Sequence, residues 1–377
     1  MPTYDLIVLG CGAVGSAAAY EAARRGLRVL GLDRFDPPHD QGSSHGRTRM
    51  IRQAYFEHPD YVPLVLRAYE RWAELERAAG RTLYRETGLL EIGPADGEVV
   101  PGVKGAAAAH RLAVDELSPD EIERRFPGFR VPAGMVGVFE RRAGFLHVER
   151  CIAAQLEQAA ARGAELRTNE AVRAWRVDGA TVVVETDAGR YEAGALAIAA
   201  GPWSSGVLRD LNVRLAVRRK PQYWFAPRTN DYRADDGTPA FLYETGDGVF
   251  YGFPVVGPEG LKCAEHSGGA PLDDPAQSSR AVDRADLARV ERFLAAHLPG
   301  MSTTLVDHAP CLYTMSPDAN FLVDRHPAAP HTAFVAGLSG HGFKFAPVLG
   351  EALVDLALEG RSSLPIGFLS AARFARG

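Results

Sequence analysis

The fold is decided by residues 4–15, Tyr-Asp-Leu-Ile-Val-Leu-Gly-Cys-Gly-Ala-Val-Gly, where an apolar strand runs directly into a glycine-rich turn. Gly10, Gly12 and Gly15 form a G-x-G-x-x-G pattern. Its glycines permit a tight turn, close approach of the backbone to a pyrophosphate, and close packing of the next helix on the strand. The segment therefore predicts a dinucleotide-binding turn, with a purely structural tight turn as the alternative.

The residues after this turn continue the same pattern. An Ala-rich helix ends at Gly26, and a second strand covers residues 28–33. Asp33 ends that strand 18 residues after Gly15, near the spacing of a carboxylate that accepts a hydrogen bond from a ribose hydroxyl. Cys11 occupies a variable position, where a small side chain packs. Together these features favour a Rossmann-type nucleotide-binding domain.

The rest of the chain alternates between two kinds of pattern. Helices are indicated over 61–79 and 149–162, and a strand over 332–336 precedes a glycine-rich turn, 337–342, and a helix ending near Gly360. Between the helix over 149–162 and the strand over 332–336, the sequence predicts a hairpin (173–177 and 181–186), a strand (195–200), and a strand-rich region (220–314) that includes one helix (284–298). We expect an α/β fold with a discontinuous Rossmann-type domain (1–85, 141–219 and 315–377) and an inserted α+β substrate domain (86–140 and 220–314) built on a mixed β-sheet.

Composition excludes several classes of protein. The net charge is -5, with 46% apolar and 24% charged residues, which is typical of a globular protein and gives no basic surface for nucleic acid. No apolar stretch approaches the ~18 residues needed to cross a bilayer, so we expect a cytoplasmic protein without membrane partners. The four cysteines have no C-x-x-C spacing, and we expect no metal site.

Four further motifs carry a resemblance to a known family. They are Gly-Ser-Ser-His-Gly-Arg-Thr-Arg (42–49), Tyr-Gly-Phe-Pro (251–254), Cys-Leu-Tyr-Thr (311–314) and Ser-Gly-His-Gly-Phe-Lys (339–344). In this order they resemble the monomeric sarcosine oxidase family, which includes N-methyltryptophan and pipecolate oxidases. The resemblance implies bound FAD, a small secondary amino acid as substrate and dioxygen as electron acceptor. We expect a monomer or weak oligomer.

The cysteines differ in what they imply. From its apolar neighbours alone, Cys311 is more simply an inert buried thiol. The resemblance implies instead that its sulfur is joined to the 8α position of FAD as a thioether. Cys151 falls on the apolar part of a helix and Cys263 within a strand, so both are expected in the core.

A hairpin near residue 258 predicts which side chains share a face. If residues 257–260 form the loop, Val255 lies opposite Lys262 and Tyr251 opposite His266. Because strand faces alternate, Tyr251, Lys262 and His266 project from one face. A solvated surface remains the alternative. The resemblance implies that Lys262 activates oxygen and that Tyr251 and His266 line the substrate site.

Other candidates depend more on the resemblance. Arg52 and Lys344 are expected to hold a substrate carboxylate, with surface charges as the alternative, and Tyr313 is expected beside them. The N-terminus of the final helix is expected to stabilise negative charge on reduced flavin. His45 and Arg49 resemble residues that line the flavin ring and are expected to share in catalysis. The full set of expected FAD contacts is Gly10, Gly12, Ala13, Val14, Gly15, Asp33, Ser43, His45, Arg49, Val172, Gly201, Trp203, Cys311, Gly340, His341, Gly342, Phe343 and Lys344.

These features predict oxidation of a secondary amine such as sarcosine to an imine by hydride transfer to FAD, followed by hydrolysis of the imine, with dioxygen reduced to hydrogen peroxide. Within the class, a cyclic imino acid oxidase acting on pipecolate or proline remains open, since Arg47 stands where the family pattern has an acid. Three alternatives from other classes also remain open: a flavoprotein dehydrogenase with a non-oxygen acceptor, an NAD-dependent dehydrogenase and a non-catalytic nucleotide-binding protein.

Overall fold

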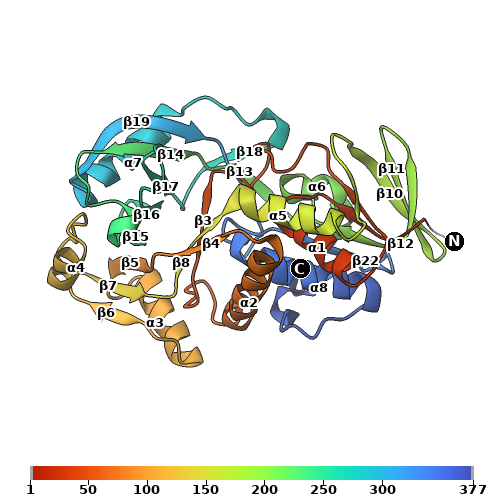
Figure 1. The fold of residues 1–377 in the computed structure, drawn as a ribbon, viewed down its shortest axis with the longest axis horizontal. Coiled ribbons are helices and arrows are strands. Elements are labelled where there is room, and N and C mark those ends of the chain that lie inside the picture. The colour runs from red at the N-terminus through yellow and green to blue at the C-terminus, as the bar shows by residue number, and fades with distance from the viewer. Residues whose placement is uncertain (1–2, 375–377) are drawn as a thin grey trace.

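The computed structural model describes residues 3–374, which form two large β-sheets with helices packed against them (Figure 1). The first sheet has the strand order β10-β11-β12-β1-β2-β9, with β22 beside β12 and β21 beside β22. Its parallel strands are β1 (Tyr4–Leu9), β2 (Val29–Leu32), β9 (Glu165–Arg167), β12 (Arg190–Ile198) and β22 (Thr332–Ala336). Its antiparallel strands are β10 (Val172–Asp178), β11 (Thr181–Thr186) and β21 (Leu322–Arg325).

Side chains of β1 alternate between the two faces of this sheet. Leu6 and Val8 pack with the helices α1 (Ala13–Arg24), α5 (Val148–Ala160) and α8 (Ala346–Glu359), and α2 (Tyr61–Ala79) packs outside α5 and α8. Ile7 and Leu9 pack instead with Val182 of the β10–β11 hairpin, which covers the opposite face. The apolar run of β1 is therefore buried on both sides, as in other parallel sheets.

Helices α1 and α8 approach each other closely. A Cβ atom added to Gly350 of α8 would lie 2.7 Å from the backbone nitrogen of Ala18 and 2.8 Å from the Cβ of Ala17, both in α1. The alanines of α1 and this glycine thus allow near contact of the two backbones.

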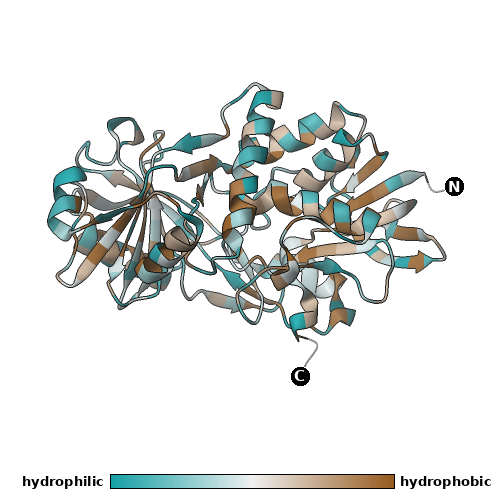
Figure 2. Cartoon of the chain, turned by 90° about the horizontal axis from the view of Figure 1, so that it is seen from below, coloured by the Kyte–Doolittle hydropathy of each residue, from teal (hydrophilic) through white to brown (hydrophobic). Residues whose placement is uncertain are grey.

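The second sheet has the strand order β19-β14-β17-β16-β15-β5-β7-β6 and is antiparallel except where β15 meets β5. Phe241 and Phe250 pack with Phe293 of α7 on one face. Figure 2 shows that hydrophobic residues follow the strands of both sheets. The strands are β5 (Leu89–Pro94), β6 (Asp115–Leu117), β7 (Met135–Glu140), β14 (Gln222–Pro227), β15 (Ala240–Thr245), β16 (Gly248–Phe253), β17 (Leu261–Glu265) and β19 (Met301–Ala309), and the helices are α3 (Val99–His110), α4 (Pro119–Arg125) and α7 (Arg284–His297).

Two small sheets and several short elements join the large ones. The first small sheet has the order β3-β8-β4 and the second β18-β13-β20. The remaining elements are β3 (Thr48–Ile51), β4 (Tyr84–Glu86), β8 (Gly144–His147), β13 (Ala216–Arg219), β18 (Ala270–Leu272), β20 (Leu312–Met315), α6 (Ser204–Val207), and the 3-10 helices η1 (Gly201–Trp203), η2 (Arg209–Leu211), η3 (Ala234–Asp236), η4 (Pro275–Gln277), η5 (Phe343–Phe345), η6 (Gly367–Leu369) and η7 (Ala371–Phe374).

The register expected for the β16–β17 hairpin is wrong by two residues. Tyr251 lies opposite Ala264 rather than His266, and Phe253 rather than Val255 lies opposite Lys262. Pro254 has no N–H to donate, and Val255 bonds instead to Tyr232 O and Ala234 N. A shift of two residues keeps every side chain on its expected face.

Among residues 3–374, no helix is long and apolar enough to span a membrane. Within the same residues, no group of three or more His, Cys, Asp or Glu side chains is arranged to hold a metal ion.

Candidate active site

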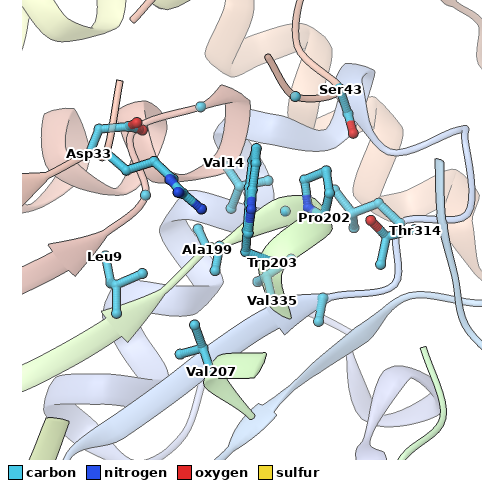
Figure 3. A pocket seen from close by; sticks show the side chains of 18 of the residues that line it. Leu9, Val14, Asp33, Ser43, Ala199, Pro202, Trp203, Val207, Thr314 and Val335 are labelled. Carbon is cyan, nitrogen blue, oxygen red and sulfur yellow. The ribbon is translucent and has the colours of Figure 1, made fainter. Parts of the chain in front are cut away.

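A cavity of about 840 Å³ lies at the carboxyl ends of the parallel strands, beside the N-terminus of α1 (Figure 3). This is the edge at which open α/β sheets bind ligands. The expected residues that line it are Gly10, Gly12, Ala13, Val14, Asp33, Ser43, Arg49, Val172, Gly201, Trp203, Tyr313, Gly340, Gly342 and Phe343. Gly15, His45, Cys311, His341 and Lys344 do not line it.

The backbone geometry of the turn requires glycine at positions 10 and 15. Gly10 has φ +86°, and a Cβ on Gly15 would lie only 1.6 Å from the carbonyl oxygen of Gly10. Asp33 braces the turn, since one carboxylate oxygen accepts from Cys11 N at 2.7 Å and the other from Phe35 N at 2.9 Å. Each oxygen has a further lone pair for a ligand.

The cavity offers polar groups that fit a dinucleotide. Trp203 Nε1 and Thr314 Oγ1 are buried and have no hydrogen-bond partner within the described part of the chain, and both residues line the cavity, as Figure 3 shows. The N-terminus of α1 supplies free backbone N–H groups for a phosphate. At the other end Gly340 has φ +85°, and a Cβ there would lie 2.2 Å from the Tyr313 ring. The cavity therefore carries polar groups at defined points and a backbone turn at each end, as a dinucleotide site requires.

Cys311 lies directly before β20 and is 2% exposed. Its Sγ lies 3.3 Å from a guanidinium nitrogen of Arg49, which also donates to Ser43 O at 3.1 Å. Leu312 and Tyr313, the next two residues, line the cavity. The thiol therefore lies beside a cation and next to residues that line the cavity.

Lys262 is buried on the face of β17 that was expected for it. Its Nζ donates to the carbonyl oxygens of Gly46 at 2.7 Å and Thr48 at 2.9 Å, and lies 5.3 Å from the ring centroid of Trp224 and 5.1 Å from that of Phe253. Burial lowers the pKa of Lys262 well below its ordinary value, and nearby Arg49 lowers it further. An ammonium has three donors, so one remains beyond these two carbonyls.

Tyr251, His266 and Tyr313 gather beside Arg49. His266 Nδ1 lies 3.3 Å from Tyr313 Oη, and its ring is 6.4 Å from that of Tyr251, centroid to centroid. Burial lowers the pKa of His266 to about 3 and raises that of Tyr251 to about 12. All three side chains are therefore uncharged around neutral pH.

Arg52 and Lys344 come from distant parts of the chain and meet at Tyr55. The Arg52 guanidinium lies 4.5 Å from the Tyr55 ring centroid and Lys344 Nζ lies 5.0 Å from it. Both cations are 3% exposed, so neither is a surface charge. Arg52 is paired with Glu57, and its Nε lies 3.5 Å from Glu91 Oε1.

Lys344 and His341 are held by the same network. Lys344 Nζ donates to His341 O at 2.8 Å and lies 3.3 Å from Tyr55 Oη, and that hydroxyl lies 2.6 Å from His341 Nδ1. Burial lowers the pKa of Lys344 to about 7, assisted by Arg52. His341 thus holds Lys344 and the Tyr55 hydroxyl rather than lining the cavity.

His45 lies in a second cavity of about 420 Å³. Its Nε2 has no hydrogen-bond partner, and burial lowers its pKa to about 4. Arg47, in the same cavity, bonds to Asp307 at 2.6 Å and stacks 4.4 Å from the Trp224 ring centroid.

Sequence reasoning missed Tyr55, Glu57 and Glu91 as partners of the two cations. Glu91 had a visible signal, because it is the only charged residue in the apolar strand segment Leu89–Ile92. Tyr55 and Glu57 lie in a segment without helical or strand periodicity and carried no such signal.

The glycine turn, the bracing acid and the larger cavity define a dinucleotide-binding protein of the α/β class. Residues 5–356 match the family model described as DAO, FAD dependent oxidoreductase. The chain is 40% identical to a monomeric sarcosine oxidase of Streptomyces avermitilis (99% of this chain, 98% of that one) and 39% identical to an N-methyl-L-tryptophan oxidase of Salmonella dublin (99% and 100%). It is also similar to the structure of NikD, "an unusual amino acid oxidase essential for nikkomycin biosynthesis", with TM-score 0.86, 29% identity and 98% of each chain covered.

The chain therefore belongs to the family of FAD dependent oxidoreductases.

Proposed function

We propose that this protein oxidises a small secondary amino acid, such as sarcosine or another N-alkyl amino acid, with dioxygen as the electron acceptor. The observation that carries the proposal is the pair of buried cations, Arg52 and Lys344, which share the Tyr55 ring. A guanidinium and an ammonium in a buried site are suited to a carboxylate. The relatives named as oxidases of sarcosine and of N-methyl-L-tryptophan support the same substrate class.

FAD is assigned to the larger cavity. The glycine turn and the α1 N-terminus would hold the pyrophosphate and Asp33 a ribose, while Arg49, Tyr313 and the turn at Gly340 would adjoin the flavin ring. We also propose that Cys311 holds the flavin through a thioether, because its sulfur lies 3.3 Å from a guanidinium nitrogen of Arg49, and Arg49, Leu312 and Tyr313 all line the larger cavity. The expected division into segments 1–85, 141–219 and 315–377 for FAD, and 86–140 and 220–314 for substrate, is proposed on the same basis.

Each proposed residue has a separate task. When bound, FAD accepts a hydride from the carbon beside the substrate nitrogen and passes the electrons to dioxygen. Arg52 and Lys344 would orient the carboxylate, and the uncharged Tyr251, His266 and Tyr313 would form a wall that excludes water. Lys262 would stabilise negative charge on dioxygen with its remaining N–H. The imine product takes up water and releases an amine and an aldehyde.

Oxidation of a cyclic imino acid is the second candidate. Arg47 stands where the family pattern has an acid, and it is held by Asp307 and Trp224 beside the second cavity.

A peroxide-coupled assay tests the proposal. Sarcosine, N-methyl amino acids, L-pipecolate and L-proline would be compared at equal concentration, with and without an artificial dye acceptor. Peroxide from N-methyl amino acids supports the first candidate, and peroxide mainly from the cyclic substrates supports the second. Dye reduction without peroxide would instead identify a dehydrogenase, and dependence on added NAD would identify a different class altogether.

A further inference from the structure

Glu91 is a carboxylic acid in the interior of the protein. It lies in β5 and is 0% exposed, and among residues 3–374 neither of its carboxyl oxygens has a hydrogen-bond partner. Arg52 Nε, at 3.5 Å, also lacks a hydrogen-bond partner. A buried carboxylate without hydrogen bonds is unfavourable, and such a group tends to keep its proton.

The position of Glu91 in the second sheet directs it toward the proposed substrate site. Glu91 pairs with Leu242 of β15, and Leu242 pairs in turn with Tyr251 of β16. Residues opposite one another on adjacent strands project from the same face. Glu91 therefore projects from the face that carries Tyr251, two strands away, or roughly 10 Å at the usual strand spacing.

The charged groups near Glu91 come from several elements. Burial raises the pKa of Glu91 to about 8, Arg52 and Lys344 oppose this rise, and the carboxylates of Glu140 and Glu57 add to it. Glu140 accepts the N–H groups of Gln53 and Ala54, and the charge of Arg52 also acts on it. Around pH 7, Arg52 is therefore paired with one charged acid, Glu57, and one neutral acid, Glu91.

We propose that Glu91 is a specificity-determining residue, whose proton keeps Arg52 available to the carboxylate of the substrate. This inference rests on the proposed function. Without that proton, Glu91 would be a second anion beside Arg52 and would compete with the substrate carboxylate for the guanidinium. Binding of a carboxylate is then coupled to retention or uptake of a proton at Glu91.

The direction of the pH effect follows from this coupling. A bound anion raises the pKa of Glu91 above its value of about 8 in the free protein. Affinity for the carboxylate is therefore full below that value and falls about tenfold per pH unit above it. Lys344, whose pKa is about 7, adds a separate loss of affinity as its charge disappears.

The test measures binding to the FAD-loaded protein by calorimetry. The probe is methoxyacetate, in which an ether oxygen replaces the amine of sarcosine, so that the ligand keeps its carboxylate and cannot form an imine. Titrations in two buffers with different ionisation enthalpies count the protons taken up on binding. Dissociation constants are measured from about pH 6.5 to about pH 9.5, on both sides of the Glu91 pKa.

Glu91→Gln keeps the shape of the side chain and removes its proton equilibrium. The variant should bind methoxyacetate like the wild type near pH 7 and about tenfold more tightly than the wild type one pH unit above the Glu91 pKa. At that pH, the variant should take up close to one proton fewer than the wild type when methoxyacetate binds. Glu116→Gln, an exposed change on β6 of the same sheet, should leave both quantities unchanged.

Glu91→Leu provides a second non-titrating variant if the glutamine protein folds poorly, because apolar replacement of a buried polar group is often tolerated. An unchanged proton count and pH slope in either folded variant would overturn the role of Glu91. If the wild type nevertheless forms peroxide from sarcosine, the proposed function stands and only the role of Glu91 is overturned. If methoxyacetate does not bind the wild type at all, the carboxylate site itself is wrong, and the role of Glu91 is overturned with it.

Discussion

Lys344 Nζ and the Arg52 guanidinium lie over one aromatic ring, that of Tyr55. The two cations come from distant parts of the chain, since 291 positions separate Tyr55 from Ala346, the first residue of the helix that follows Lys344. Two like charges on one buried ring repel each other unless anions balance them. Glu57 balances one, and with Glu91 protonated the group retains a net positive charge. A site of this charge attracts a carboxylate.

Removing one of these cations should weaken carboxylate binding. We expect Lys344→Met to raise the dissociation constant of methoxyacetate by roughly 10- to 100-fold, because a hydrogen bond to a charged group contributes about 1.5–3 kcal/mol. Arg52→Ala should do the same and also lower stability, since it leaves the half-buried Glu57 without its cation. Lys104→Met, at an exposed ion pair, is the control. Unchanged affinity in both site variants would remove these residues from the substrate site.

The flavin should remain with the polypeptide after acid precipitation. A thioether at Cys311 survives denaturation, whereas noncovalent contacts do not. Cys311→Ser should release yellow colour to the supernatant, and Cys151→Ser, a matched change of another buried cysteine in α5, should not. The absorbance of the pellet and of the supernatant shows where the flavin is, and a yellow wild-type supernatant would contradict the covalent link.

Lys262→Met keeps the length of the side chain and removes its charge. A cation about 4 Å from the developing charge on dioxygen, at an effective dielectric near 20, interacts by roughly 4 kcal/mol, or on the order of a thousandfold in rate. We expect the oxygen-dependent half-reaction to slow by up to this factor. Anaerobic bleaching of the flavin by substrate should change much less.

Stopped-flow absorbance separates the two half-reactions of Lys262→Met. The carbonyl oxygens of Gly46 and Thr48, together with the negative charge that develops on dioxygen, favour the protonated lysine despite its burial. If bleaching by substrate collapses while the oxygen reaction keeps its rate, Lys262 belongs to substrate binding.

Gly350→Ala should destabilise the protein by about 1–3 kcal/mol, because its new methyl group would press on the backbone of α1 at Ala17 and Ala18. Gly105→Ala in α3 is the matched control, since nothing lies within 4 Å of the added methyl group. That control should be neutral or slightly stabilising, because alanine favours a helix over glycine. Urea unfolding of both variants measures the difference, and equal midpoints would mean that α1 and α8 can separate at little cost.

Local patterns in the sequence predicted much of the first sheet. The helix over 61–79 and the strand over 332–336 have the expected bounds, because glycines and periodicity mark their ends. The same-face arrangement of Tyr251 and Lys262 could also be predicted, since it depends only on strand alternation. The register could not, because Val255 is held by Tyr232 and Ala234, which are distant in sequence.

The candidate site was less accessible to sequence reasoning. The glycine turn and Asp33 follow from spacing, whereas Arg52 and Lys344 became candidates only through resemblance. Their environment depends on contacts between segments with no local signal, above all the pairing of Arg52 with Glu57 and the approach of Glu91. Such partners are set by packing between elements, which periodicity within one element does not encode.

The order in which the strands occur along the chain has a consequence for biosynthesis. The ribosome makes β1 and α1 early, then the whole second sheet, and only afterwards β22 with the turn at Gly340. Because both ends of the larger cavity are needed to enclose a dinucleotide, the nascent chain must hold an incomplete cavity, with its apolar strand edge at β12 uncovered, while most of the protein is synthesised. FAD can therefore be fully enclosed only after β22 and the turn at Gly340 have been made.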